Sequence, residues 1–464
     1  MTSSGEEPRL RRSVGPVQLG LYALGSMLGS GVYGLMGAAA GVAGNAVWLA
    51  FLVAMVAALL TALSYASLGS RYPHAGGAAY IVERAFGRPF LSFGVGLAVA
   101  FSSLASVAAQ SRVFAANLGE LAGLEEAPLS LIAIGFILFL AAVVLRGIRE
   151  SVAFNIVCTC IEAAGLLIVV GVGLTWWGET AYLELPPPPA GEPGQAAALV
   201  LMQAAVLTFF AFIGFEDTIN IAEECRDPQR TIPLAVIGAM IAATTLYVAV
   251  AITAVSVVPW AELAKSPGPL TRVVETAAPL LPPLVFTSIT LFAVTNTALV
   301  NYVTASRLVY GMARRGLVPP RLGAVHERRR TPHVSILLLL AIAAPLALIA
   351  EVAHLASAAV LLLLGVFTLV NLALVVLQRR PCEPKGRFEI HPAAPLAGAV
   401  VCASLAAARI ASGDWRAPAI AGGLVATIAV TYLMISQRQA QWRAGAAARE
   451  QRPPTGAPHR EGQT

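Results

Sequence analysis

Residues 16–41, PVQLGLYALGSMLGSGVYGLMGAAAG, form the stretch that decides the fold. The run exceeds the roughly 20 apolar residues that a helix needs to cross a bilayer, yet Gly29, Ser30 and Gly31 lie near its middle. Backbone at membrane depth can unwind only where it lines a cavity inside the protein. The stretch therefore predicts a membrane-spanning helix that is interrupted at these residues, and the N–H groups freed there favour a carboxylate.

A second run with the same character occupies residues 197–222, AALVLMQAAVLTFFAFIGFEDTINIA. Glu216 and Asp217 lie inside it, and each acid costs roughly 2.5–3.5 kcal/mol to place in a membrane, so both must face a cavity or carry a proton. Gly214 predicts a break just before them, and the carbonyl groups that end the first half-helix favour an ammonium group. The alternative is that the helix ends near Gly214 and both acids lie outside the membrane.

The composition excludes an ordinary water-soluble protein. Of the 464 residues, 57% are hydrophobic and 12% are charged, whereas soluble proteins are about 25% charged. The apolar runs predict an all-α polytopic membrane protein with about twelve transmembrane helices, because an open sheet cannot satisfy its backbone groups in lipid. The predicted spans are 16–41, 45–69, 89–115, 128–146, 152–176, 197–222, 232–257, 283–312, 333–350, 353–378, 394–411 and 417–436.

The basic residues predict how the chain is oriented. With these spans, all but five of the 31 Lys and Arg residues fall on one side of the membrane, and basic residues concentrate on the cytoplasmic side. We therefore expect a multi-pass protein of the plasma membrane, which in a bacterium is the inner membrane, with both termini in the cytoplasm. The same distribution accounts for the net charge of +6 without a nucleic-acid partner.

The chain divides into three parts by composition. Residues 1–15 form a short cytoplasmic segment, and residues 16–436 form a single transmembrane domain. The remaining residues, 437–464, are rich in Arg, Gln, Gly and Pro, which predicts a disordered cytoplasmic tail.

Two repeats are predicted inside the transmembrane domain. Residues 16–176 hold the first five spans, residues 197–378 hold the next five, and residues 394–436 add two more helices. The first span of each repeat carries a break, and the two run in opposite directions, which is the inverted-repeat pattern of secondary transporters. Donors for a carboxylate opposite acceptors for an amine suit one ligand class, the α-amino acid.

Four motifs then carry a family resemblance. They are GSGVY at 29–33, RYPxAGGxxY at 71–80, FIGFE at 212–216 followed by EExRDPQRxIP at 223–233, and RxxYxMARRGLVP at 307–319. Together they resemble the amino acid–polyamine–organocation superfamily, above all its cationic-amino-acid-transporter-like and bacterial amino acid permease branches. The resemblance implies the LeuT-type fold, in which helices 1–5 and 6–10 are inverted repeats, helices 1 and 6 are broken, and two helices follow.

The resemblance also implies roles for individual residues. Ser30 and Gly31 match the turn that binds the substrate carboxylate, and the backbone carbonyls of Phe210 and Ile213 match the ammonium site. The other implied roles are a further carbonyl at Met27, a lid over the substrate at Phe210, a pH-sensitive gate at Glu216 and a contact with the substrate side chain at Asn301.

Glu162 departs from the pattern of the proton-coupled relatives, which often carry a lysine in helix five. It lies about ten residues into its span, roughly 15 Å deep at 1.5 Å per residue, and burial favours the protonated carboxyl. We expect Glu162 to be a proton site or to pair with Arg112 or Arg307. A sodium ion held by Glu162 with Thr295 or Thr297 is the alternative.

These observations predict a secondary active amino acid transporter that works by proton-coupled symport and alternating access. The alternatives are an exchanger of amino acids, or of an amino acid and an amine, and a membrane sensor that binds an amino acid without moving it. Glu216, Asp217 and Asn301 favour a cationic or polar substrate, and binding of protons is the alternative role for the two acids. The six histidines and five cysteines show no ligand spacing, so we expect no metal, no cofactor beyond the coupling ion and no enzyme activity. Either a monomer or a homodimer fits the sequence.

Overall fold

The fold is a bundle of long helices, seen in a computed structural model that describes residues 10, 12–74, 76–123, 128–187, 196–266, 268–349, 352–411 and 415–450. Within these residues the single β contact is an isolated bridge between Val14 and Cys225. Ten helices there are long and apolar enough to cross a membrane. The prediction of an all-α polytopic membrane protein is therefore confirmed.

Twelve helical segments coincide with the twelve predicted spans. They are α1 (Pro16–Ala43), α2 (Val47–Arg71), α4 (Pro89–Leu121), α5 (Leu129–Arg146), α6 (Ile148–Gly173), α7 (Ala197–Phe209), α9 (Pro228–Val257), α12 (Pro283–Arg314), α13 (His333–Ile349), α14 (Val352–Gln378), α15 (Ala393–Ala411) and α16 (Arg416–Glu450). Of these, α13 is a shorter apolar helix. That all twelve cross the membrane in the LeuT-type order stays a prediction.

Four shorter helices lie where the sequence predicted only loops or the end of a span. They are α3 (Gly77–Phe86), α8 (Asp217–Asn220), α10 (Trp260–Leu263) and α11 (Pro269–Ala277). The expected disordered tail also begins as helix, because α16 continues to Glu450; residues 451–464 lie outside the described residues. The Gln439 side chain, 2% exposed, donates a hydrogen bond to the Leu317 carbonyl at 2.7 Å and holds this extension.

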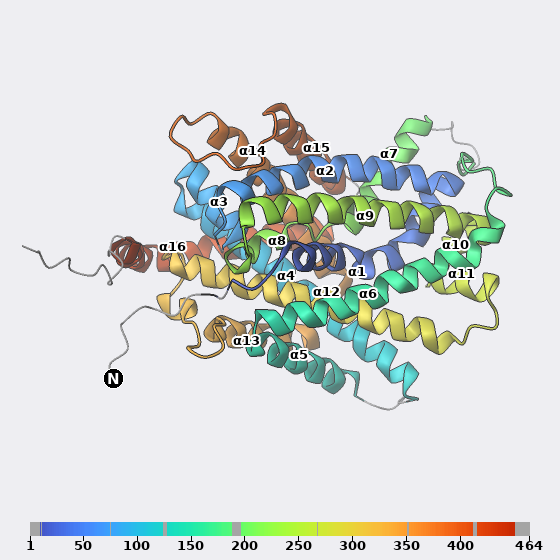
Figure 1. The fold of residues 1–464 in the computed structure, drawn as a ribbon, viewed down its shortest axis with the longest axis horizontal. Helices are drawn as coiled ribbons and strands as arrows, with labels where there is room; N and C mark the ends of the chain where they lie inside the picture. Colours follow the sequence, from blue (N-terminus) through green and yellow to red (C-terminus); the bar gives the residue numbers. More distant parts are fainter. Residues whose placement is uncertain are drawn as a thin grey trace, which may run out of the picture.

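The first helix lies at the centre of the bundle. Figure 1 shows α1 between α9, α6 and α12, and it packs against all three. Its apolar residues point in every direction, and Leu19, Leu28, Val32 and Met36 are all fully buried, as expected of a helix that is hydrophobic all round and buried within a bundle. A central position for an interrupted helix lets its broken backbone face protein and not lipid.

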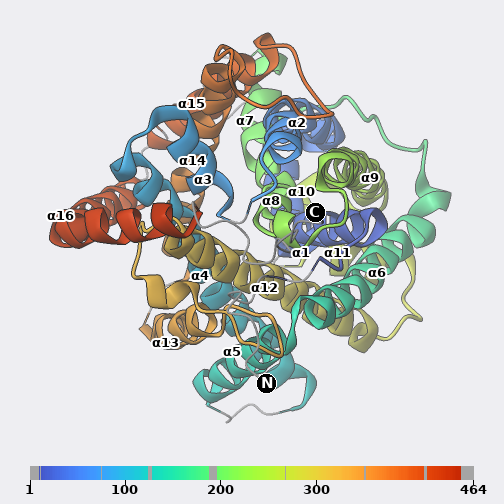
Figure 2. The same cartoon turned by 60° about the vertical axis from the view of Figure 1, so that its left-hand side comes forward.

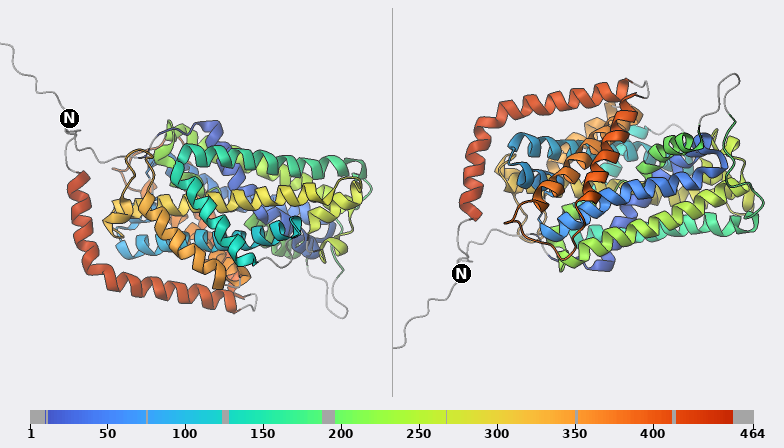
Figure 3. Two further views of the ribbon diagram at one scale, coloured as in Figure 1. Left: turned by 90° about the horizontal axis from the view of Figure 1, so that it is seen from below. Right: turned by 90° about the horizontal axis from the view of Figure 1, so that it is seen from above.

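The outer helices show the opposite pattern. Figure 2 shows α5, α13, α15 and α16 around the rim of the bundle, and Figure 3 shows that α16 bends and turns across one end of the bundle. On α16, Leu433 is 71% and Met434 79% exposed. A helix that leaves such large apolar side chains uncovered is suited to face lipid.

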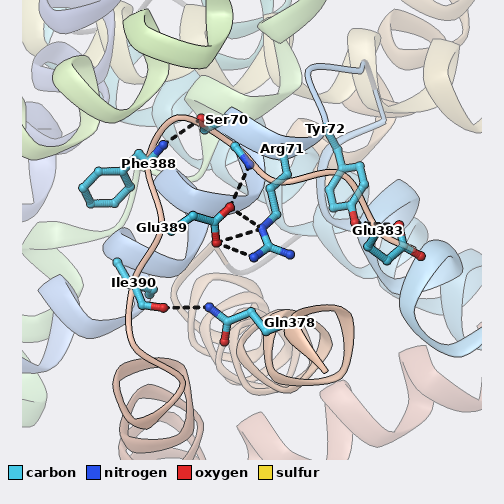
Figure 4. Close-up of polar contacts among 9 residues, drawn as sticks. Ser70, Arg71, Tyr72, Gln378, Glu383, Phe388, Glu389 and Ile390 are labelled. Atoms are coloured by element: carbon cyan, nitrogen blue, oxygen red, sulfur yellow. Dashed lines mark hydrogen bonds and ion pairs between the residues drawn. The ribbon is translucent and has the colours of Figure 1, made fainter. Parts of the chain in front are cut away.

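The loop after α14 is fastened to the ends of α2 and α3 (Figure 4). Arg71 Nε donates to Glu389 Oε1 at 2.8 Å, and Glu383 accepts hydrogen bonds from the Tyr72 hydroxyl at 2.9 Å and from Arg84 Nε at 3.1 Å. Burial opposes the charge on Glu383, but these two hydrogen bonds outweigh it and lower the pKa of that carboxyl below its usual value. The loop is thus part of the folded end of the bundle.

Candidate functional site

The first predicted break is present in α1. Gly29 has φ −21° and ψ −171° inside an otherwise helical run. A Cβ at Gly29 would lie 2.2 Å from Thr297 Oγ1, so the hydrogen side chain lets α12 approach the break closely. A helix that restarts after such a break has N–H groups without intrahelical acceptors. The prediction of an interruption near residues 29–31 is confirmed.

The second predicted break follows α7. The helix tightens into a 3₁₀ turn at Phe210–Phe212, Ile213 is extended with φ −65° and ψ 136°, and Gly214 has φ +132°. A positive φ of this size favours glycine because it has no Cβ. The chain then resumes as α8, and Glu216 and Asp217 are each only 6% exposed. The prediction of a break at Gly214 is confirmed, and both acids lie inside the protein. That they also lie within the membrane stays a prediction.

The two breaks meet at one point. A Cβ at Gly214 would lie 2.6 Å from the Ser26 carbonyl oxygen, so the second break rests directly on the backbone just before the first. The Ser26 hydroxyl donates a hydrogen bond to Asp217 Oδ2 at 2.5 Å. In turn, the Gly214 N–H donates to Glu216 Oε2 at 2.8 Å, which folds that carboxylate back over the break.

A cavity of about 290 Å³ opens beside this crossing. Its wall comes from α1, α4, the α7–α8 break, α12 and α14. The residues that line it are Ser26, Met27, Gly29, Val99, Ser102, Ser103, Ser106, Ala109, Gln110, Phe210, Ile213, Gly214, Glu216, Asp217, Thr297, Asn301, Ala359, Val360 and Leu363. A pocket with an apolar wall and a few converging polar groups is suited to a small ligand.

Four of the residues that the sequence proposed for the substrate line this cavity, namely Met27, Phe210, Ile213 and Asn301, and so does the proposed gate residue Glu216. The Ile213 carbonyl accepts no hydrogen bond from the described residues, whereas the Phe210 carbonyl accepts one from the Ile213 N–H at 3.2 Å. Asn301 Nδ2 donates to the Thr297 carbonyl at 2.9 Å.

Ser30 and Gly31 follow the break directly. Their backbone is described as part of α1, and their side-chain environment lies outside the described residues. Their assignment as the carboxylate site therefore stays a prediction.

Tyr247 joins the two broken helices from α9. Its hydroxyl lies 2.6 Å from the Met27 carbonyl oxygen and 2.9 Å from the Ala211 carbonyl oxygen, and its proton is shared between these acceptors. The ring is fully buried and packs on Phe51 and Phe212. The Met27 carbonyl proposed for the ammonium group is thus already bound to a protein donor.

Replacing Tyr247 with phenylalanine is expected to weaken ligand binding as well as stability. The change leaves two buried carbonyl groups without their donor, at a cost of about 1–3 kcal/mol, and loosens the ends of both half-helices. We expect the dissociation constant for substrate to rise roughly 5- to 30-fold. Ligand-dependent melting of the purified protein measures both effects.

Tyr302→Phe is the matched control for that change. The Tyr302 ring is 1% exposed and its hydroxyl donates to the Ile336 carbonyl at 2.8 Å, but Tyr302 does not line the cavity. Its loss should lower the melting temperature and leave substrate affinity unchanged. Equal effects of both variants on affinity would contradict a specific role for Tyr247.

Glu162 lies behind the cavity wall and not in it. It is fully buried, and its Oε2 accepts a hydrogen bond from Asn296 Nδ2 at 3.2 Å. The same Asn296 amide lies 3.3 Å from the Gly25 carbonyl oxygen and 3.1 Å from Thr159 Oγ1. No described residue binds the second carboxylate oxygen, Oε1. Glu162 is therefore connected through one amide to α1, four residues before its break.

The predicted ion pair of Glu162 with Arg112 or Arg307 is wrong. Arg307 pairs with Glu224 at 3.3 Å, and both side chains are completely buried. Arg112 instead donates to the Ala347 carbonyl at 3.1 Å. The partner of Arg307 lies 83 positions earlier in the chain, which the linear sequence cannot reveal.

The proposed sodium ligands have other partners within their own helix. Thr295 Oγ1 donates to the Leu291 carbonyl at 2.7 Å, and Thr297 Oγ1 donates to the Ala293 carbonyl at 3.1 Å. Thr297 lines the cavity, whereas Glu162 does not.

One wall of the cavity was missed from the sequence. Ser102, Ser103, Ser106 and Gln110 all line it from α4. Their spacing of three to four residues places most of them on one helical face, so a polar stripe within the apolar run 89–115 was a readable signal. Asp217 also lines the cavity, and its carboxylate accepts a hydrogen bond from the Ser26 hydroxyl.

The fold and the cavity define a class: a multi-pass membrane protein whose polar site lies between interrupted helices. Such an arrangement is typical of membrane transporters. The chain belongs to the amino acid permease family, whose sequence profile, described as "Amino acid permease", matches residues 15–435.

Similar proteins are found in bacteria and plants. A methylthioribose transporter of Bacillus subtilis is 28% identical, over 87% of this chain and 89% of its own length. A branched-chain amino acid permease of the same organism is 28% identical, over 82% of this chain and 83% of its own. Cationic amino acid transporter 9 of Arabidopsis thaliana, a chloroplast protein, is 29% identical over 70% of this chain and 59% of its own.

Proposed function

We propose that this protein is a secondary active transporter that carries an amino acid across the plasma membrane by proton-coupled symport and alternating access. The observation that carries the proposal is the meeting of two interrupted helices at one cavity, where Gly214 rests on Ser26 and both breaks line the wall. Backbone donors and acceptors brought together in this way suit the two charged ends of a zwitterion.

The substrate would bind across the crossing. Its carboxylate would meet the N–H groups after Gly29, near Ser30 and Gly31, and its ammonium group would meet the free Ile213 carbonyl. Phe210, which lines the cavity, would cover the bound molecule. The inverted-repeat arrangement, with residues 16–176 and 197–378 as the two repeats, is the frame in which such a site forms at mid-membrane.

The wall around the substrate side chain favours a polar or cationic group. Glu216 and Asp217 bring two carboxylates to the cavity, while Ser106, Gln110 and Asn301 add neutral hydrogen-bonding groups. The names of the relatives cover a methylthioribose, a branched-chain and a cationic amino acid transporter. Thermal stabilisation of the purified chain across all amino acids and common polyamines would identify the substrate, because a ligand that binds only the folded form raises its melting temperature.

Two carboxyl groups are proposed to carry the coupling proton. Glu216 reaches the cavity and holds the Gly214 N–H. Glu162 lies behind α1 and connects through Asn296 to the Gly25 carbonyl. Protonation at either place changes hydrogen bonds to one of the two breaks, and this supports a link between proton binding and the shape of the site.

Glu162→Gln and Glu216→Gln are expected to abolish substrate-dependent proton uptake. Glutamine keeps the size and the hydrogen-bond acceptor of each side chain but cannot exchange a proton. The measurement is acidification of the lumen of proteoliposomes, read with a pH-sensitive dye as substrate enters. Glu184→Gln, in the loop before α7, is the control and should leave the signal intact. Proton uptake that survives both cavity-region substitutions would refute these roles.

Transport assays in the same proteoliposomes distinguish proton symport from the alternative functions. Counterflow of labelled substrate without net uptake would select an exchanger, and uptake that requires a sodium gradient would select the sodium alternative. Binding with no flux under any gradient would identify a sensor. Accessibility labelling of the termini tests the proposed orientation, with both ends in the cytoplasm, and size measurement in detergent tests whether the protein is a monomer or a homodimer.

A further inference from the structure

A second cavity lies at the end of the bundle where α1, α6 and α9 begin. Its volume is about 270 Å³, and Arg12, Ser13, Gln18, Arg149 and Arg226 line it. No described residue lines both this cavity and the one between the broken helices. It is therefore a separate site, and what it binds does not depend on the transport proposal.

The three arginines come from three segments that the fold holds together. Arg12 precedes α1, Arg149 lies in the first turn of α6, and Arg226 precedes α9. The Arg226 N–H donates to the Val14 carbonyl at 2.8 Å, and the Ser13 N–H donates to the Glu224 carbonyl at 2.9 Å. These backbone bonds fix the segments that carry Arg12 and Arg226 side by side, while α1 packs on α6.

The charge on the described wall of the cavity is positive. The described residues that line it include three guanidinium groups and no carboxylate. Four carboxylates lie close by in the chain. Glu224 pairs with Arg307 and Asp227 pairs with Arg387, while Glu150 and Glu223 are not among the residues that line the cavity. The N-terminal ends of three long helices add partial positive charge of the same sign. Basic residues that only orient a membrane protein need to lie on one side of it, but they need not converge on a hollow.

We propose that this cavity binds a phosphate group, that of an anionic lipid headgroup. Guanidinium groups match phosphate oxygens in geometry and charge. Arg149 is the second residue of the membrane-crossing segment Ile148–Trp176, and Arg226 lies just before the segment Pro228–Val257. The cavity thus lies at the depth of the headgroups, where basic pockets between helices take anionic lipids. A phosphate held there connects the starts of α1, α6 and α9.

Thermal-shift titration of the purified full chain in an uncharged detergent tests the site. The probe is dioctanoyl phosphatidylglycerol, and dioctanoyl phosphatidylcholine serves as the zwitterionic comparison. We expect phosphatidylglycerol to raise the melting temperature of the unaltered protein and phosphatidylcholine to have no effect. Each arginine near an anionic headgroup contributes about fivefold in affinity, so replacing Arg12, Arg149 and Arg226 with glutamine should weaken binding roughly a hundredfold.

The matched control removes the same charge elsewhere. Arg321, Arg328 and Arg379 are exposed arginines that do not line the cavity, and changing all three to glutamine should leave the affinity within about twofold. If the triple variant does not fold, Arg149→Gln alone should weaken lipid binding about fivefold. Inorganic phosphate that competes with the lipid at the same site would indicate a soluble source, and phosphate without effect would indicate the lipid. No shift with any anion, or equal losses in the cavity and control variants, would overturn the proposal.

Discussion

Gly214→Ala is expected to weaken substrate binding by at least roughly tenfold while the helices around it still form. The residue has φ +132°, and an added Cβ would lie 2.6 Å from the Ser26 carbonyl oxygen. A residue with a Cβ in such a conformation costs about 1–3 kcal/mol, and the clash falls on backbone, which cannot turn aside. The two breaks must then separate, so affinity should fall at least roughly tenfold. Melting-temperature shifts with saturating substrate and uptake by proteoliposomes both measure this loss.

Gly238→Ala provides the control for a glycine in a helix. A Cβ at Gly238, within α9, would meet no atom within 4 Å, and alanine is favoured over glycine there by about 1 kcal/mol. We expect unchanged affinity and equal or higher stability. Normal substrate binding by Gly214→Ala would show that the crossing of the two broken helices is not the binding site.

Arg307→Met is expected to cause the largest loss of stability. Arg307 and Glu224 are both fully buried, and Arg307 Nε lies 3.3 Å from Glu224 Oε2. Removing the arginine leaves a buried carboxylate without a cation, which costs about 3–5 kcal/mol. The double variant Glu224→Leu/Arg307→Met, in which no charge is stranded, should recover most of that loss. The free energy of unfolding in mixed micelles gives the coupling of the pair.

An exposed ion pair offers the comparison. Arg272 and Glu275 lie 3.8 Å apart with side chains 52% and 47% exposed. Arg272→Met should change stability by less than about 1 kcal/mol, since exposed pairs contribute little. A loss at Arg307 no greater than the loss at Arg272 would contradict the buried ion pair.

The interruptions of α1 and of the α7–α8 segment could be predicted because their signals are local. Gly29 and Gly214 stand inside apolar runs of bilayer length, and Glu216 and Asp217 cannot lie against lipid. The short helices α3, α10 and α11 could not be predicted in the same way. They are too short to be stable alone, and they form because they pack on longer helices such as α4, α1 and α6.

The two backbone breaks of the candidate site could be predicted from the sequence, but many of the side-chain contacts around them could not. Residues of the motifs, such as Ile213 and Glu216, meet in the cavity. The partner of Arg307 depends on which helical faces meet, and Glu224 lies 83 positions away in the chain. The helix around Gln439 also depends on a long-range contact. Its side chain donates a hydrogen bond to the Leu317 carbonyl, although the composition of this segment is typical of disorder. Long-range contacts of this kind leave no local signal.

The Tyr247 hydroxyl links the helices that form one wall of the cavity. It holds the Met27 and Ala211 carbonyls, and so ties α1, the end of α7 and α9 into one unit. Separation of α1 from α7 would break these hydrogen bonds. A rigid-body movement of α1, α7 and α9 together would keep them. The opposite wall, formed by α4, α12 and α14, is free of this tie. In the proposed alternating access, we therefore expect a passage to open where α4 and α14, which Tyr247 does not reach, separate from this unit.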